Sequence, residues 1–431
     1  MELITLPLPY GCDSLARFAQ LKPLGNSVLL DSGEGYLDHI DVMTAEPAQI
    51  VCLREPKALT DTVEIIRKHL REHKVAPGAL PVSPGWFGVW SYTLGQALES
   101  LQGQHTDLPL LWMGFYPALI VTDHAAQASY LQYLSGYQQT AEKLKAAFLA
   151  EGEEDDKFVL SGRFTGNLDS QEYLATFNKV QDYIHCGDCY QINLSREYSA
   201  PYTGSIWQAY RKLRASQSAP MGAFVETADW SLLSLSPERF IRSADAAVET
   251  KPIKGTRARS CDPDLDLALA QELRSSPKDR AENLMIVDLL RNDLGKSCET
   301  GSIKVDKLFE VESFSNVHHL VSTVSGRIKT GMDALDVLLG AFPGGSITGA
   351  PKRRAMEIID ELEPHSRGFY CGSLVTLDVC GRMDSNILIR SLVAKDGMIR
   401  CWGGGGIVAD STCVSEYQEI NDKIGKLLTS L

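Results

Sequence analysis

The chain has 431 residues, of which 44% are hydrophobic and 23% are charged, so it can bury a large core and is not disordered throughout. Acidic residues outnumber basic ones by 55 to 42, which gives a formal charge of −13. We expect no nucleic-acid partner, because the sequence also lacks a basic stretch of the kind that follows a phosphate backbone.

The N-terminus and the cysteines predict a cytoplasmic protein. The first residues, MELIT, lack the basic and apolar regions of a signal peptide, and no run of about 18 apolar residues predicts a membrane span. The ten cysteines have the irregular spacing of reduced thiols rather than of a disulfide framework. An anionic substrate would need local arginines, lysines, backbone N–H groups or a metal to hold it against the overall charge.

The first part of the chain predicts strands separated by turns rich in glycine and proline. Strand-like runs include residues 86–90 (WFGVW) and 119–122 (LIVT). Residues 136–150 predict an exposed helix that leads into 151–156 (EGEEDD), a charged run that cannot bury itself. We therefore predict an N-terminal region at 1–150 and a C-terminal region at 165–431.

The C-terminal region predicts long amphipathic helices mixed with strands. Strand-like runs occur at residues 224–227 (FVET), 374–377 (LVTL) and 387–390 (ILIR). Helices and strands do not alternate regularly enough for a doubly wound parallel sheet. We therefore expect an α+β fold with mixed or antiparallel sheets flanked by helices.

A helix is predicted from Ser276 and Pro277, which form a typical helix start, to Gly295, which ends it. Its predicted apolar face is made of Leu284, Val287 and Leu294. Asp279 and Glu282 lie about one turn apart near its N-terminus. Acids at that end most often only complement the helix dipole.

A last helix is predicted from near Ser415, and it carries two acids, Glu416 and Glu419, one turn apart. Its buried stripe is predicted to be Ile420, Ile424, Leu427 and Leu431. The two acids could contribute to a magnesium site, because this ion takes a few carboxylates together with water and substrate oxygens. Taken alone, such a helix is more often a solvated surface.

Two glycine-rich segments punctuate this region. Residues 342–352 (FPGGSITGAPK) lead into a helix predicted at about 352–362, so their amides could face an anion. The loop is not a phosphate-binding Walker A motif, because Ala350 stands where that motif requires lysine. Residues 403–406 (GGGG) lack the spacing of a dinucleotide-binding motif and indicate either a close approach to the backbone or a tight turn.

Lys254 lies between Ile253 and Gly255 in a segment with little helical character. A lysine in such a segment is more often found at the surface. A buried lysine, in contrast, would lose its charge readily and could act as a nucleophile at neutral pH.

Together and in this order, these segments resemble the chorismate-utilising enzymes, most closely from about residue 171 to 428. The matching stretches are 187–191 (GDCYQ), 236–240 (SPERF), 252–256 (PIKGT), 279–293, 318–322 (HHLVS), 344–352, 389–391 (IRS), 404–411 and 416–419 (EYQE). The resemblance implies the fold of anthranilate synthase component I, with a β-sandwich core flanked by helices.

The residues at two positions distinguish members of this family that have different activities. Anthranilate synthases typically have Ala at the position of Lys254, whereas members that aminate chorismate at C4 have Lys there. Isochorismate- and salicylate-forming members place a water-activating Lys where Gln191 aligns, and glutamine cannot act as that base. The resemblance thus implies amination without loss of pyruvate, giving 4-amino-4-deoxychorismate, a precursor of 4-aminobenzoate and folate. An anthranilate synthase component I and, more distantly, a non-catalytic tryptophan-binding regulatory subunit are the alternatives.

The resemblance also implies the site residues. Lys254 would be the nucleophile and Glu238 the general acid, while Glu282 and Glu419, with Asp279 and Glu416 nearby, would hold Mg²⁺. Chorismate would be bound by Gly255, Thr256, His319, Thr348, Tyr370, Arg390, Gly404, Gly405 and Gly406.

Partners follow from the same resemblance. No segment resembles a glutaminase, so the ammonia should come from a separate glutamine amidotransferase subunit. Residues 27–32 (SVLLDS) resemble the tryptophan-binding segment of anthranilate synthases, although Asp31 stands where Glu is usual there. Ser32, Pro220 and Met221 would form that pocket, and plain core packing of these residues is an equal alternative.

Overall fold

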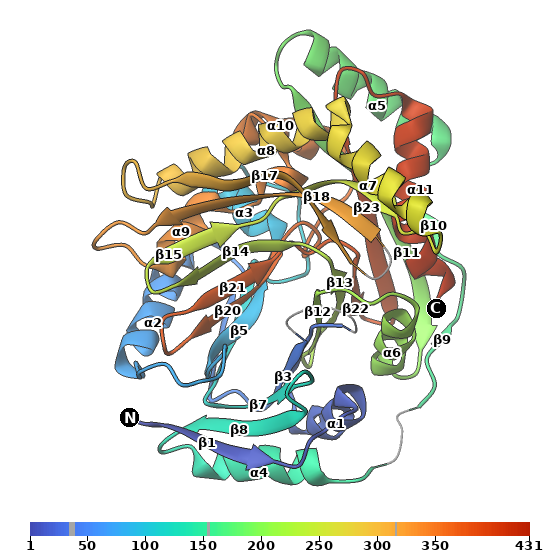
Figure 1. Ribbon diagram of the computed structural model, residues 1–431. Helices are drawn as coiled ribbons and strands as arrows, with labels where there is room; N and C mark the ends of the chain where they lie inside the picture. Colours follow the sequence, from blue (N-terminus) through green and yellow to red (C-terminus); the bar gives the residue numbers. More distant parts are fainter. Residues whose placement is uncertain (34–38, 153–155, 315–316) are drawn as a thin grey trace.

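The computed structural model describes residues 1–33, 39–152, 156–314 and 317–431, whose strands form two large antiparallel sheets (Figure 1). The larger sheet has the order β1 (Leu3–Leu8), β8 (Ala128–Leu134), β7 (Ala118–Asp123), β3 (Ile40–Thr44), β2 (Ser27–Asp31), β12 (Met221–Glu226), β13 (Ser231–Ser236), β22 (Ser391–Lys395), β23 (Met398–Ile407), β11 (Gln191–Thr203) and β10 (Thr165–Gly166). Two short strands, β9 (Val159–Leu160) and β19 (Gly349–Ala350), also pair with β11.

The smaller sheet faces the larger one. Its order is β16 (Ile253–Ala258), β18 (Val317–Arg327), β15 (Ala247–Thr250), β14 (Arg239–Ala244), β21 (Met383–Asn386), β20 (Ser373–Asp378), β5 (Gly85–Trp90), β6 (Leu111–Tyr116) and β4 (Gln49–Leu53), with β17 (Lys304–Ser313) paired to β18. These sheets confirm the expected α+β fold with an antiparallel sandwich.

Both sheets contain strands from both predicted regions of the chain. In the larger sheet β2 pairs with β12, and in the smaller sheet β5 pairs with β20. Part of the charged run at the predicted boundary, residues 153–155, lies outside the described residues. The division into 1–150 and 165–431 therefore stays a prediction, and residues of both regions pack together in each of the two hydrophobic clusters of the core.

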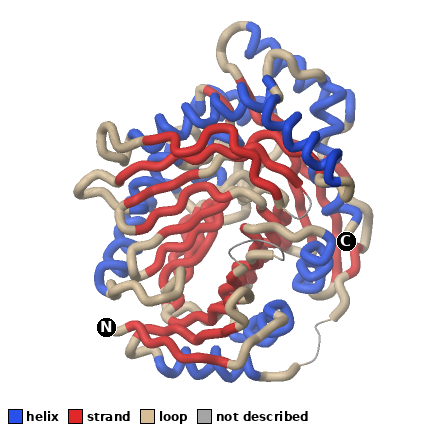
Figure 2. Tube along the Cα trace, in the orientation of Figure 1, coloured by secondary structure: helices blue, strands red, loops and turns tan. Residues whose placement is uncertain are grey.

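Strands of the larger sheet bury both faces, as alternation along β12 shows. Ala223 and Val225 pack in the core between the sheets, whereas Phe224, between them in sequence, packs toward the helices on the other side. Figure 2 shows the helices around the outside of the two sheets. The larger sheet is covered by α1 (Ser14–Leu21), α4 (Gln138–Leu149), α5 (Ser170–His185), α6 (Ile206–Ser216), α10 (Lys352–Leu362) and α11 (Cys413–Thr429).

The smaller sheet carries α2 (Leu59–Glu72), α7 (Pro263–Ser275) and α8 (Pro277–Gly295). Two further helices, α3 (Tyr92–Leu98) and α9 (Ala334–Ala341), complete the described helices longer than one turn. Among the described residues, none of the helices is both long and apolar enough to cross a membrane.

The predicted helices that carry site residues are confirmed. Ser276 caps α8 by accepting a hydrogen bond from the Asp279 N–H, and α10 and α11 begin within two residues of the predicted starts. The predicted apolar face of α8 is wrong at Leu284, which is 45% exposed, although Val287 and Leu294 are buried. The helix predicted at 136–150 is α4, and its exposure is confirmed for one face only, because Ala141, Leu144 and Phe148 are buried against the sheet.

The strand predicted at residues 387–390 is wrong, because these residues form a connection between β21 and β22. Arg390 has a φ of +51°, a left-handed conformation that interrupts an extended strand. The apolar side chains of Ile387 and Leu388 are buried all the same. The hydrophobic pattern there reflects burial of a loop in the core.

Candidate active site

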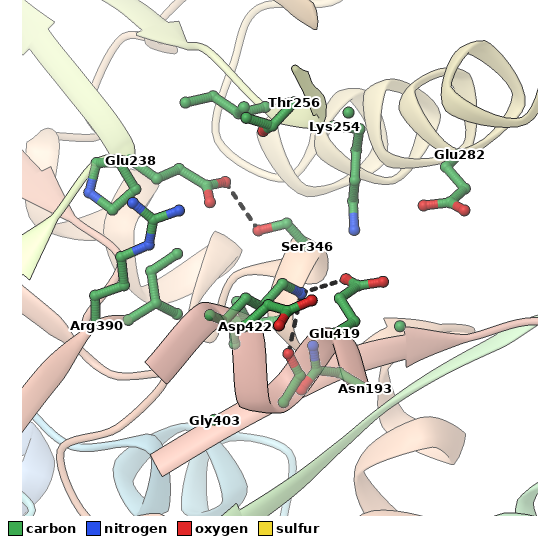
Figure 3. A pocket seen from close by; sticks show the side chains of 18 of the residues that line it. Asn193, Glu238, Lys254, Thr256, Glu282, Ser346, Arg390, Gly403, Glu419 and Asp422 are labelled. Carbon is green, nitrogen blue, oxygen red and sulfur yellow. Dashed lines mark hydrogen bonds and ion pairs between the residues drawn. The ribbon is translucent and has the colours of Figure 1, made fainter. Parts of the chain in front are cut away.

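A cavity of about 710 Å³ lies between β11 and β23 of the larger sheet, β16 and β18 of the smaller sheet, and the helices α8 and α11 (Figure 3). The residues that sequence predicts for the site and that line this cavity are Glu238, Lys254, Gly255, Thr256, Asp279, Glu282, His319, Tyr370, Arg390, Gly404, Gly406, Glu416 and Glu419. Segments far apart in the sequence thus meet in one cavity.

Lys254 extends from β16 into the cavity, between Glu238 on one side and Glu282 on the other (Figure 3). Burial among protein atoms lowers its pKa, and the charges of Glu282 and Glu238 oppose that effect in part. Lys254 is half-buried in the wall of the cavity. Its amine is easier to deprotonate than that of an ordinary lysine, which a nucleophile requires.

Glu238 lies just before β14 and is buried. Burial raises the pKa of Glu238 to about 7, against the opposing effect of the Lys254 charge. The Ser346 hydroxyl donates a hydrogen bond to Glu238 Oε1 at 3.1 Å. A carboxyl group with this pKa can both donate and accept a proton at neutral pH.

His319 faces Thr256 across the pairing of β16 with β18. Its Nδ1 lies 2.9 Å from the Thr256 hydroxyl oxygen. Burial lowers the pKa of His319 to about 4, and the nearby Arg390 charge adds to this effect. His319 is therefore a neutral imidazole in the cavity wall at neutral pH.

Two cavity positions require glycine. Gly255 has a φ of +79°, and a Cβ there would lie 2.8 Å from Asp279 Cγ. A Cβ at Gly404 would lie 2.8 Å from the Tyr370 hydroxyl and 2.9 Å from Asn193 Oδ1. The glycine run at residues 403–406 thus permits a close approach of side chains to the strand backbone.

Two predicted substrate-binding residues do not line this cavity. Thr348 is fully buried, and its hydroxyl lies within hydrogen-bonding distance of the carbonyl oxygens of Gly344 (3.2 Å) and Gly345 (3.3 Å). Gly405 is also buried, on the side of β23 that faces Glu416. Their placement supports a role in shaping the wall rather than in contacting a ligand.

The predicted metal ligands Glu282 and Glu419 face the cavity from α8 and α11. Burial raises the pKa of Glu282, and the charges of Asp279 and Glu419 raise it further. Lysines accompany both acids, with Lys278 Nζ 3.9 Å from Glu282 and Lys423 Nζ 2.6 Å from Glu419. Two carboxylates that repel each other across a cavity are suited to a shared cation.

The other two acids differ in their partners. Asp279 forms an ion pair with Arg257 at 3.2 Å. Glu416 accepts a hydrogen bond from Ser411 on Oε1, while its buried Oε2 has no partner among the described residues. No group of three or more acidic, histidine or cysteine side chains in the described part of the chain is arranged to hold a metal by itself. A pair of carboxylates still fits Mg²⁺, which fills its remaining positions with water and substrate oxygens.

Several cavity residues were not predicted. Lys423 lies one helical turn after Glu419, and the sequence spacing indicates that both are on the same face of α11, although it assigns Lys423 no role in the site. Ser346 lies in the glycine-rich loop and reaches the cavity through its own side chain. Asn193 and Trp402 gave no signal, because only strand pairing brings them to this wall.

The start of α10 does not line this cavity, and anion binding by the glycine-rich loop stays a prediction. The cavity is lined by Ser346 and Ile347 of that loop rather than by the first residues of the helix. Lys352, the first residue of α10, is buried and donates hydrogen bonds to Asp293 Oδ2 at 2.7 Å and to the Ala341 carbonyl oxygen at 2.6 Å. This lysine fastens the loop to the end of α8.

A second cavity, of about 280 Å³, lies between the two sheets. It is lined by Ser32, Pro220 and Met221, as predicted, together with apolar side chains of both sheets. Asp31 also reaches it, and its carboxylate accepts hydrogen bonds from Tyr210 at 3.0 Å and Arg214 at 3.1 Å.

Known proteins resemble the chain over nearly its full length. The family model described as chorismate binding enzyme matches residues 26–429. An aminodeoxychorismate synthase component 1 from Klebsiella aerogenes is 41% identical, over 99% of this chain and 98% of that protein. An anthranilate synthase component 1 from Streptomyces coelicolor is 36% identical, over 86% of this chain and 77% of that protein. The crystal structure of anthranilate synthase component I from Streptococcus pneumoniae has a TM-score of 0.77 and 27% identity, over 91% of this chain and 93% of that chain.

Proposed function

The chain belongs to the chorismate binding enzyme family, and we propose that it is the subunit that aminates chorismate to 4-amino-4-deoxychorismate. The observation that carries the proposal is Lys254 and Glu238 in one cavity, since an amine nucleophile and a proton donor can together replace a hydroxyl group through a covalent intermediate. The full-length similarity to an aminodeoxychorismate synthase component 1 supports it. The lower identity and coverage of the anthranilate synthase relative favour it over that alternative.

The proposed reaction begins when neutral Lys254 attacks C2 of chorismate. A C2–N bond forms, the ring double bonds shift, and the C4–O bond breaks as Glu238 gives its proton to the departing hydroxyl, which leaves as water. Ammonia then forms a bond to C4, the double bonds shift back, and the C2–N bond breaks. Glu238 takes a proton from the new ammonium group, so Lys254 and Glu238 both regain their starting protonation states.

The cavity also offers groups that would hold the substrate. Arg390 would bind the carboxylate of the enolpyruvyl side chain, because a guanidinium donates two parallel hydrogen bonds to a carboxylate. Tyr370 would contact the same side chain, beside the backbone of Gly404 and Gly406. Neutral His319 would line the ring without adding charge.

Glu282 and Glu419 would hold Mg²⁺, with Asp279 and Glu416 as further acids or water-binding groups. When bound, the ion supplies positive charge that neutralises the ring carboxylate of chorismate and offsets the acidic protein. The unpartnered Oε2 of Glu416 is consistent with a nearby donor such as an ion-bound water.

We further propose a separate glutamine amidotransferase subunit as the ammonia source and a cytoplasmic location. The word component in the names of the relatives supports a partner, and ten free cysteines suit a reducing compartment. Free ammonium should replace glutamine when the chain acts alone.

Tryptophan is the ligand proposed for the second cavity. Ser32, Pro220 and Met221 line a space between the sheets whose apolar walls would suit an indole ring. Charged residues at the same cavity, including Asp31 and Arg239, would suit the amino and carboxylate groups.

The deciding experiment incubates the purified chain with chorismate, Mg²⁺ and ¹⁵N-labelled ammonium and identifies the product by mass spectrometry. We expect a product that contains ¹⁵N and keeps the enolpyruvyl group, with no pyruvate released. Pyruvate and fluorescent anthranilate would instead support the alternative activity. A chain without turnover would indicate the regulatory role, although the presence of Glu238, Glu282 and Glu419 argues against it.

A further inference from the structure

Ser346 contacts the proposed general acid from a loop that has no other part in the proposed reaction. Its hydroxyl donates to Glu238 Oε1 at 3.1 Å inside the cavity (Figure 3). We propose that Ser346 is a positioning residue for Glu238: by occupying Oε1, it leaves Oε2 to carry the proton and to face the C4 hydroxyl of the substrate. This inference rests on the proposed function.

The two oxygens of a protonated carboxyl group have different roles. One carries the O–H donor, and the other is a carbonyl-like acceptor. A serine hydroxyl that donates to Oε1 satisfies the acceptor, so the catalytic proton resides on Oε2. Without that contact, the proton could sit on either oxygen, and the carboxyl group could rotate away from the substrate.

The glycine-rich loop holds Ser346 in place. A Cβ at Gly345 would lie 2.2 Å from Leu289 Cδ2 on α8, and a Cβ at Gly344 would lie 2.7 Å from Ile387 Cδ1. The loop backbone therefore rests directly on α8 and on the core. Any residue with a Cβ at Gly344 or Gly345 would push the loop off these contacts and move Ser346 away from Glu238.

Buried hydrogen bonds fix the same loop from the other side. Arg367 donates from Nη1 to the Ile347 carbonyl oxygen at 2.9 Å and is itself paired with Glu363 at 2.8 Å. The Thr348 hydroxyl lies against the carbonyl oxygens of its own loop. Thr348 thus stabilises the loop internally, whereas Ser346, two residues earlier, turns outward to the cavity. This contrast separates a structural hydroxyl from one that serves Glu238.

The charges around Glu238 determine how its pKa should change when the Ser346 hydroxyl is removed. Lys254 on β16, Lys423 on α11 and Arg390 between β21 and β22 all favour the ionised carboxylate, as does the hydrogen bond from Ser346. Removing the hydroxyl should therefore raise the pKa of Glu238 as well as free the carboxyl group to rotate. A purely structural role for Ser346 would not move a pH profile in this direction.

The experiment mixes the full chain with chorismate and Mg²⁺ in the absence of ammonia and measures the rate at which the Lys254 adduct accumulates. We expect Ser346→Ala to lower the rate of adduct formation by about 10- to 100-fold, because a misplaced general acid loses part of its catalytic contribution. The alkaline limb of its pH profile should shift to higher pH. Ser346→Thr keeps the hydroxyl and should stay within about threefold of wild type, with unchanged chorismate affinity in both variants.

The outcomes separate two failures. Ser346→Ala with wild-type rate and pH profile would overturn the positioning role while leaving the proposed function intact. Absence of both adduct and aminated product in the wild-type protein would overturn the proposed function and this inference with it. Should Ser346→Ala not fold, Ser346→Cys keeps the size of serine with a much weaker donor, and it should show the same slowing and pH shift.

Discussion

Glu238 and Lys254 line one cavity, and burial moves their pKa values toward each other. The pKa of Glu238 rises to about 7, whereas that of Lys254 falls. The same pair in water would be a carboxylate and an ammonium ion. Burial therefore favours the neutral acid and the neutral amine, which are the forms that the proposed reaction uses.

Replacing Lys254 by alanine should abolish the covalent adduct. We expect turnover with chorismate, Mg²⁺ and ammonium to fall below about 1% of wild type, because the loss of a nucleophile removes the first step. Intact-protein mass spectrometry after mixing with chorismate checks the adduct. Lys251→Ala is the matched control, since Lys251 lies on the same segment but pairs with Glu312. Full activity of Lys254→Ala without an adduct would exclude the nucleophile role.

The pH dependence of adduct formation should reflect the protonation of Glu238. Below its pKa of about 7 this residue holds the proton that it must donate, so the rate of adduct formation should fall as pH rises through about 7. Lys254 must be neutral to attack, and burial lowers its pKa toward the range in which Glu238 still holds its proton. Glu238→Gln keeps the shape of the side chain but cannot donate the proton. We expect its rate of adduct formation to be about 10²- to 10⁴-fold lower, and its pH–rate profile to have no alkaline limb near pH 7. An unchanged alkaline limb in this variant would assign it to another group.

Magnesium dependence should follow the two facing carboxylates. Glu282→Gln and Glu419→Gln should each raise the Mg²⁺ concentration needed for half-maximal activity by about 100-fold or more. Loss of a residue that only supports the metal ligands typically lowers metal affinity by about 10- to 100-fold, and loss of a ligand should cost at least as much. Titration of activity with Mg²⁺, and Mn²⁺ binding followed by electron paramagnetic resonance, measure this. Glu361→Gln on α10, where Glu361 pairs only with Tyr183 among its described contacts, should leave the titration unchanged. Equal Mn²⁺ binding by all three variants would place the ion elsewhere.

Tryptophan should bind the cavity between the sheets. After unfolding and refolding to remove any ligand that co-purifies, calorimetry should show heat with tryptophan. At about 100 times the Kd, the ligand should stabilise the protein by about 2.7 kcal/mol. Phenylalanine, with its smaller ring, should give a weaker response. No heat and no rise in Tm with tryptophan would support plain core packing around Ser32, Pro220 and Met221.

Local sequence signals predicted much of the site. Ser276, Pro277 and Gly295 set the ends of α8, because capping and helix termination depend on adjacent residues. The spacing of the acids on α8 and α11 placed each pair on one helix face. The residues alone did not predict that α8 and α11 face each other. Only the resemblance to the family implied this arrangement.

The rest depended on contacts that are distant in sequence. The pairing of β2 with β12 and of β5 with β20 has no local signal, since each antiparallel partner lies far along the chain. The buried loop at residues 387–390 has the apolar composition of a strand, and only the φ of Arg390 reveals the break. Leu284 is similar, because the side of α8 that is covered depends on which strands pack against it.

The order of strands in the larger sheet has a consequence for synthesis on the ribosome. β22 and β23 follow all the other described strands of the two sheets in the sequence, yet they lie in the middle of the larger sheet, between β13 and β11. Until they emerge, β13 and β11 each keep an unpaired edge, and such edges are templates for pairing with other chains. The glycine wall of the cavity arrives on β23, so no partly made chain can hold the site. We expect the nascent protein to depend on chaperones until these two strands emerge, because the described strands made before them already expose core residues.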